Sequence, residues 1–187
     1  RGIDFETNLF ELLALENSTN LILGSSFVSR FQKDNNPKFN LPQNVGIYGL
    51  RSNLISGNFN YYLEYVHKYN DPAGSIADNS NNYASGNAIK TSLTYFQKGL
   101  GFSFDAHRVD NMEFRSERQQ SKEYIINYIP TLSKQHSYTL LAFYPCATQS
   151  NGEIGFQSDL YYKFDRGTTF GGKYGTKINI NYSRVLA

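Results

Sequence analysis

The sequence is short of several residue types, and each shortage excludes a class of protein. It holds 1 Cys and no Trp in 187 residues, so no disulfide within the chain can staple the fold. The formal net charge of +2 is too small to indicate binding to nucleic acid or to an acidic membrane surface. The longest apolar runs, such as Leu140 to Phe143, have only four residues, whereas a membrane helix needs about 20 apolar residues. We therefore predict no disulfide scaffold, no nucleic-acid partner and no spanning helix.

Aromatic residues, by contrast, are abundant. The chain carries 15 Tyr and 14 Phe, and aromatics make up 16% of it, although mean hydropathy is only -0.50. A disordered chain would be poor in such residues. The length of 187 residues suits a single domain spanning 1–187. The composition thus predicts a folded domain whose structure uses many aromatic side chains.

The clearest periodicity lies between Glu153 and Ser183, which we predict to be two long strands joined by the turn Asp165-Arg166-Gly167. Side chains alternate across a strand with period two, so each strand has one apolar and one polar face. The apolar positions are Ile154, Phe156, Leu160, Tyr162 and Phe164 in the first strand, and Phe170, Tyr174, Ile178, Ile180 and Tyr182 in the second.

Similar alternation recurs along the chain. The segments predicted as strands are 2–15, 20–32, 44–55, 58–68, 88–97, 100–109, 124–130, 136–144, 153–164 and 168–183. Leu12-Leu13 interrupts the first alternation, so 10–15 also fits a helical turn, and 124–130 is short. We therefore expect nine or ten strands.

The connections alternate in length. Short turns are predicted at Ser56-Gly57, Lys98-Gly99, 133–135 and 165–167, and long polar loops at 33–43, 69–87, 111–123 and 145–152. In an up-and-down meander, alternate connections lie at opposite ends. Short turns at one end and long loops at the other are typical of outer-membrane barrels.

Alternation alone fits both a membrane barrel and a soluble sandwich, because each hides one face of every strand. Three features favour the barrel: segments near the ~9–11 residues that cross a bilayer, Tyr and Phe gathered towards the strand ends, and the loop asymmetry. The polar face is then predicted to line the lumen with Glu64, Lys90, Asp105, His107, Glu153, Asp159, Lys163, Lys173 and Lys177. The apolar face is predicted to meet lipid with Phe59, Tyr61, Leu63, Phe102, Phe104, Phe156, Leu160, Tyr162, Ile178, Ile180 and Tyr182.

A family resemblance lies mainly in the C-terminal third. It is carried by Tyr128-Ile129-Pro130, Lys134-Gln135-His136, Phe143-Tyr144-Pro145, 152–157, Tyr162-Lys163-Phe164 and 171–176. These stretches resemble an uncharacterised family of outer-membrane β-barrel proteins from Bacteroidetes. The resemblance implies a location and association with envelope machinery, but no reaction and no functional residue. Barrel chains commonly finish on an aromatic residue, whereas this one finishes on Ala187, which suggests a segment of a larger barrel.

No combination of residues predicts catalysis or metal binding. His136 and Ser137 are adjacent, so in a strand they point to opposite faces and cannot meet. Asp105 and His107 share a face, and an ion pair is the favoured interpretation. The three histidines and Cys146 lack metal-ligand spacing, and the acidic residues near Asp71 and Asp78 lack the order of a calcium loop.

The sequence therefore predicts an all-β, antiparallel up-and-down meander, as a complete small transmembrane β-barrel or a segment of a larger one. We expect an outer-membrane protein with a structural, transport or scaffolding role, partnered by the lipid bilayer and by other envelope proteins. No cofactor, metal or enzymatic activity is expected. The alternative is a soluble all-β module that binds a ligand or glycan through exposed tyrosines.

Overall fold

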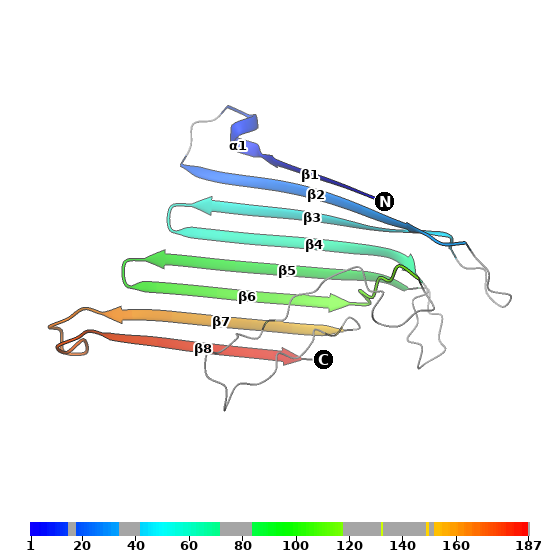
Figure 1. The fold of residues 1–187 in the computed structure, drawn as a ribbon. Coiled ribbons are helices and arrows are strands. Elements are labelled where there is room, and N and C mark those ends of the chain that lie inside the picture. The colour runs from blue at the N-terminus through cyan, green and yellow to red at the C-terminus, as the bar shows by residue number, and fades with distance from the viewer. Residues whose placement is uncertain are drawn as a thin grey trace.

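A computed structural model describes residues 1–14, 18–33, 42–71, 84–117, 132, 149 and 152–186. In order, its elements are β1 (Gly2–Asn8), α1 (Leu9–Leu12), β2 (Thr19–Phe31), β3 (Asn44–Ser56), β4 (Phe59–Asp71), β5 (Ala84–Gln97), β6 (Leu100–Asp110), β7 (Glu153–Phe164) and β8 (Thr176–Leu186). All eight strands form one antiparallel sheet in sequence order (Figure 1). The predicted all-β, up-and-down meander is confirmed.

The sheet is open rather than closed into a barrel. Within the described residues, β1 pairs only with β2, and β8 pairs only with β7. Figure 1 shows a single layer with β1 and β8 at its two edges. In the same part of the chain, no helix has the length and apolar character needed to cross a membrane.

The two ends of the sheet differ in their connections. Gly57-Asn58 joins β3 to β4, and Lys98-Gly99 joins β5 to β6. Gly57 has a φ of 54° and Gly99 a φ of 81°, as two-residue hairpin turns require. We call this the short-turn end, although it also holds the longer connections from β1 to β2 and from β7 to β8. The opposite, long-loop end holds both chain termini and the connections from β2 to β3, from β4 to β5 and from β6 to β7 (Figure 1).

The predicted tight turn at 165–167 was wrong. Residues 165–175 form a longer connection, and β8 begins at Thr176. The hydroxyl of Thr168 explains the difference, because it donates to the Asp165 carbonyl at 2.8 Å and accepts from the Gly171 amide at 3.0 Å. Phe170, Lys173 and Tyr174 therefore lie outside any strand, despite their strand-like spacing.

The first predicted strand was too long. β1 ends at Asn8, whose side chain accepts a hydrogen bond from the Phe10 amide at 3.3 Å and caps α1. The helical turn that the sequence also allowed is therefore present. The predicted strands at 124–130 and 136–144 lie outside the described residues. Part of the predicted polar loop at 111–123 was interpreted incorrectly, because residues 112–115 are buried.

The register between neighbouring strands defines two distinct faces of the sheet. Residues directly opposite each other on neighbouring strands lie on the same face. One row across the sheet, for example, joins Leu54, Tyr61, Leu93, Phe104 and Ser158. We call the face that carries this row the apolar face. The alternate positions, such as Arg51, Glu64 and Lys90, form the polar face.

Candidate functional site

The apolar face extends across all eight strands and is largely open to its surroundings, although Arg108 on β6 and Arg184 on β8 also fall on it by register. All the residues predicted to meet lipid fall on this one face by register. Large side chains on it are exposed, including Ile3 (71%), Phe59 (53%) and Ile180 (55%). Contiguous apolar surface of this extent marks a partner or a membrane rather than bulk water.

Most aromatic contacts on the apolar face lie towards the two ends of the sheet, although Phe156 and Tyr182 pack in its middle rows, 5.9 Å apart between centroids. At the short-turn end, the rings of Phe59 and Tyr95 are 4.6 Å apart between centroids. At the long-loop end, the ring centroid of His67 lies 5.3 Å from that of Tyr48 and 5.4 Å from that of Tyr69. Leu50, Leu63 and Leu93 lie between these two bands, in rows that also carry Tyr61, Tyr65 and Phe104.

The polar face carries the predicted lumen-facing residues, with one exception. Glu64, Lys90, Asp105, His107, Glu153, Asp159, Lys163 and Lys177 all fall on it by register. Lys173 does not, because it lies in the connection between β7 and β8. Its ammonium instead lies 5.6 Å from the centre of the Tyr174 ring.

Arg51 on β3 ties the first three strands together on the polar face. Its Nη1 and Nη2 donate to the two carboxylate oxygens of Asp4 at 2.8 and 2.9 Å. Its Nε donates to Glu6 at 3.1 Å and its Nη1 to the Ser26 hydroxyl at 2.7 Å. The side chain crosses β2 above Gly24, where a Cβ would collide with it. The planar guanidinium suits this forked contact.

A buried ionic cluster covers the polar face at the long-loop end. Its members are Arg30, Lys68, Asp71, Glu113 and Arg115, each no more than 9% exposed. Arg30 Nη2 donates to Asp71 Oδ1 at 2.8 Å, Lys68 Nζ to the Glu113 carbonyl at 2.8 Å, and Arg115 Nη2 to Glu113 Oε2 at 2.7 Å. Arg30 Nη1 also donates to the Arg115 carbonyl. Charges taken out of water persist only when they are paired in this way.

The cluster holds residues 112–115 down on the sheet; we call this segment the strap. Met112 and Phe114 are 3% and 2% exposed, and the Arg30 guanidinium lies 5.2 Å from the centre of the Phe114 ring. Gly86 on β5 makes room for the approach, since a Cβ there would overlap the carbonyl of Asn111. Part of the domain's small core thus lies beneath the strap and not on the apolar face.

His107 has a partner other than the predicted one. Its Nε2 lies 2.7 Å from Glu153 Oε1, and both side chains are buried, whereas Asp105 lies opposite Ser92 and Gln157. Glu153 Oε2 also accepts from the Gln149 amide at 2.8 Å. The pair therefore joins β6 and β7 to the segment that precedes β7. The predicted ion pair between Asp105 and His107 was wrong in its partner.

These arrangements anchor segments and carry no recognisable catalytic constellation. No group of three or more metal-ligating side chains occurs in the described ranges, and His136, Ser137 and Cys146 lie outside them. Sequence reasoning missed the ionic cluster, because its members come from β2, β4 and the strap. Arg30 and Asp71 are 41 positions apart, and Lys68 and Glu113 are 45 apart. No local pattern signals such contacts.

Comparison with known proteins gives a family without an activity. The whole chain, residues 1–187, matches DUF6029, a family of unknown function. The chain belongs to this family. No curated protein and no solved structure matches it. Membership thus supplies no substrate, partner or site residue.

Proposed function

We propose that this DUF6029 chain forms part of the wall of a β-barrel in the bacterial outer membrane, with its apolar face against lipid. The observation that carries the proposal is the single, predominantly apolar face shared by eight hydrogen-bonded strands. In lipid, backbone groups must be satisfied within the protein, and a hydrogen-bonded sheet achieves this once its edges are paired. The bilayer is therefore the partner that the apolar face fits best.

Strand length supports the same partner. β2, β3 and β4 each have 13 residues. At about 3.3 Å per residue and a tilt near 40°, such a strand covers about 33 Å along the membrane normal. The hydrocarbon core is about 30 Å thick. Strands of soluble sheets are usually about 5–6 residues long.

The aromatic bands indicate where the two membrane interfaces lie, and the connections indicate which end of the sheet faces the periplasm. Tyr and other aromatic rings favour the two membrane interfaces, with aliphatic side chains between them. Outer-membrane barrels have short periplasmic turns and longer extracellular loops. We therefore orient the short-turn end, at Gly57 and Gly99, towards the periplasm, and the strap towards the cell exterior.

The polar face would then line the lumen, where the strap would narrow the exterior mouth. This arrangement fits a structural, transport or scaffolding role within the envelope. The likeness of 152–157 and 171–176 to outer-membrane proteins of Bacteroidetes supports the same location. A soluble module would instead have to cover the apolar face with another protein layer.

Membrane partition tests the proposal. The chain, expressed with an outer-membrane export signal, should sediment with outer membranes, resist carbonate and urea washes, and dissolve only in detergent. Its band should shift on gels between unheated and boiled samples, as folded barrels resist detergent. Recovery of a folded monomer in detergent-free buffer would contradict the proposal. An export-signal fusion to a soluble periplasmic domain controls for trapping during export.

A further inference from the structure

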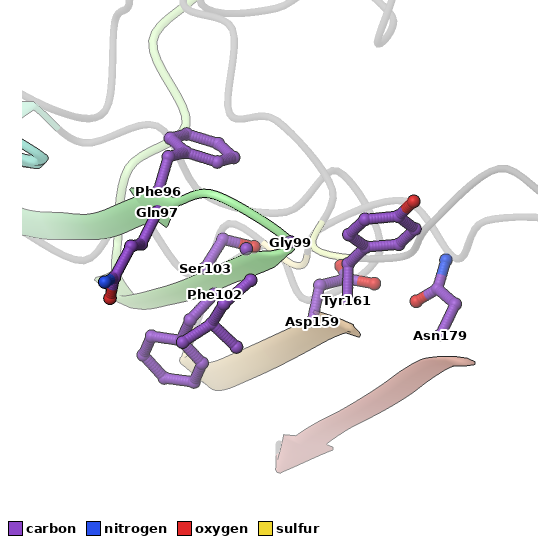
Figure 2. A pocket seen from close by; sticks show the side chains of 10 residues that line it. Phe96, Gln97, Gly99, Phe102, Ser103, Asp159, Tyr161 and Asn179 are labelled. Atoms are coloured by element: carbon purple, nitrogen blue, oxygen red, sulfur yellow. The ribbon is translucent and has the colours of Figure 1, made fainter. Parts of the chain in front are cut away.

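The polar face is hollowed at the short-turn end, between β5 and β8. The hollow has a volume of ≈ 370 Å³, within the ~300–1,000 Å³ typical of small-molecule sites. On the polar face it is lined by Phe96, Gly101, Ser103, Asp159, Tyr161 and Asn179. Figure 2 shows the rings of Phe96 and Tyr161 rising from the same side of the sheet, with Phe102 on the other.

The two rings are unexpected on this face, whose strand positions are otherwise mainly polar or small. Phe96 is 64% exposed and Tyr161 is 37% exposed. They lie in one row on either side of Gly101, where an added Cβ would meet Phe96 at 3.4 Å and Tyr161 at 3.8 Å. A glycine between two exposed rings leaves a slot with an apolar wall on each side.

Hydrogen-bonding groups lie beside the slot. The neighbouring row carries Ser103, Asp159 and Asn181, and Asn179 lies opposite Tyr161. Gln157 donates to Asp159 Oδ2 at 3.0 Å, which orients that carboxylate. A ring-shaped ligand with an apolar face and polar edges matches this combination of stacking surface and polar groups.

Positive charge lies on the other side of the slot. Lys163 is two residues beyond Tyr161 on the same strand face, and Lys177 lies directly opposite Lys163. Both are exposed, and neither forms an ion pair within the residues that the structure describes. Like charges directly opposite each other destabilise a sheet. A bound anion between the two ammonium groups would relieve that repulsion.

We infer that this slot binds an acidic saccharide. One sugar ring stacks its C–H face against Phe96 or Tyr161, its hydroxyl groups bind Asp159 and Asn179, and its carboxylate lies between Lys163 and Lys177. The inference uses only the polar face, so it holds whether or not the apolar face meets lipid. It therefore goes beyond the membrane proposal.

A simpler interpretation is that the two rings merely cover Gly101 and stabilise the sheet. The two interpretations differ in the role of the lysines. Ring packing alone needs no positive charge, whereas binding of an acidic sugar needs it. Ligand titration and charge substitution therefore separate them.

The test is calorimetric titration of the full chain, in detergent or in buffer as its solubility requires, with trigalacturonate and with neutral maltotriose. Trigalacturonate should bind about tenfold more tightly, equivalent to about 1.4 kcal/mol. Equal binding of the two sugars would overturn the assignment of the lysines. Absence of binding by either would overturn the site, while leaving membrane partition unaffected.

Variants then assign the residues. Tyr161→Ala should weaken trigalacturonate binding about tenfold, as loss of a central aromatic contact does, whereas Tyr161→Phe should retain most of it. Lys163→Gln and Lys177→Gln should each cost about fivefold, within the range of exposed charge pairs. Tyr174→Ala and Lys33→Gln are matched controls, because both residues are exposed and lie outside the slot. Equal losses in the controls would overturn the site.

Discussion

Arg30 and Asp71 form an ion pair with 2.8 Å between Nη2 and Oδ1, and their side chains are 6% and 0% exposed. The pair joins the end of β2 to the end of β4 across 41 positions. β3 runs between these two strands, so the pair bridges three strands at the long-loop end. It also fixes the position of the Arg30 guanidinium, which contacts the strap through the Arg115 carbonyl and the Phe114 ring.

Asp71→Ala should therefore be strongly destabilising. The substitution removes the carboxylate that pairs with the buried Arg30 guanidinium. Removing one partner of a buried ion pair lowers the free energy of unfolding by about 3–5 kcal/mol. The midpoint of urea-induced unfolding should fall accordingly. Glu117→Ala is the matched control, because Glu117 is exposed and should leave the midpoint unchanged. A midpoint for Asp71→Ala equal to that of the control would mean that the pair is not formed.

Gly86→Ala should displace the strap without unfolding the sheet. The added Cβ would overlap the carbonyl of Asn111, and backbone cannot rotate away as a side chain can. The amides of residues 112–115 should then exchange hydrogen faster, while those of β3 and β4 keep their protection.

Gly49→Ala is the control for this change. A Cβ at Gly49 would lie 3.6 Å from Val66 Cγ2, an ordinary van der Waals contact. Hydrogen exchange of the strap amides should therefore match that of the parent chain. Faster exchange in both variants, or in neither, would contradict the predicted close approach at Gly86.

The strands and the two-residue turns were predictable because their causes are local. Alternating side chains define the faces of β4, and the glycines at 57 and 99 supply the positive φ that tight hairpins need. The connection 165–175 was missed because hydrogen bonds of Thr168 compete with strand pairing. The burial of the strap was missed because it depends on distant partners, such as Arg30 for the Arg115 carbonyl, 85 positions away.

Arg51→Lys should loosen β1 from the sheet. Lysine keeps the charge but cannot donate simultaneously from a planar fork to both oxygens of Asp4 and to Glu6. Hydrogen exchange of the amides in β1 should quicken, and that of β4 to β8 should not. Arg108→Lys, at an exposed position of β6, is the control. Unchanged exchange in β1 would show that backbone pairing alone holds the strand.

Leu63→Arg tests which face meets lipid. Leu63 lies near the middle of β4 on the apolar face, opposite Ser52 and Thr91. An arginine at the bilayer midplane costs about 2–4 kcal/mol in a barrel. The variant should therefore insert less into lipid vesicles, measured as the heat-modifiable fraction. Ser92→Arg places the same side chain on the polar face beside Asp105 and should insert like the parent chain. If Ser92→Arg were the more disruptive variant, the assignment of the two faces would have to be reversed.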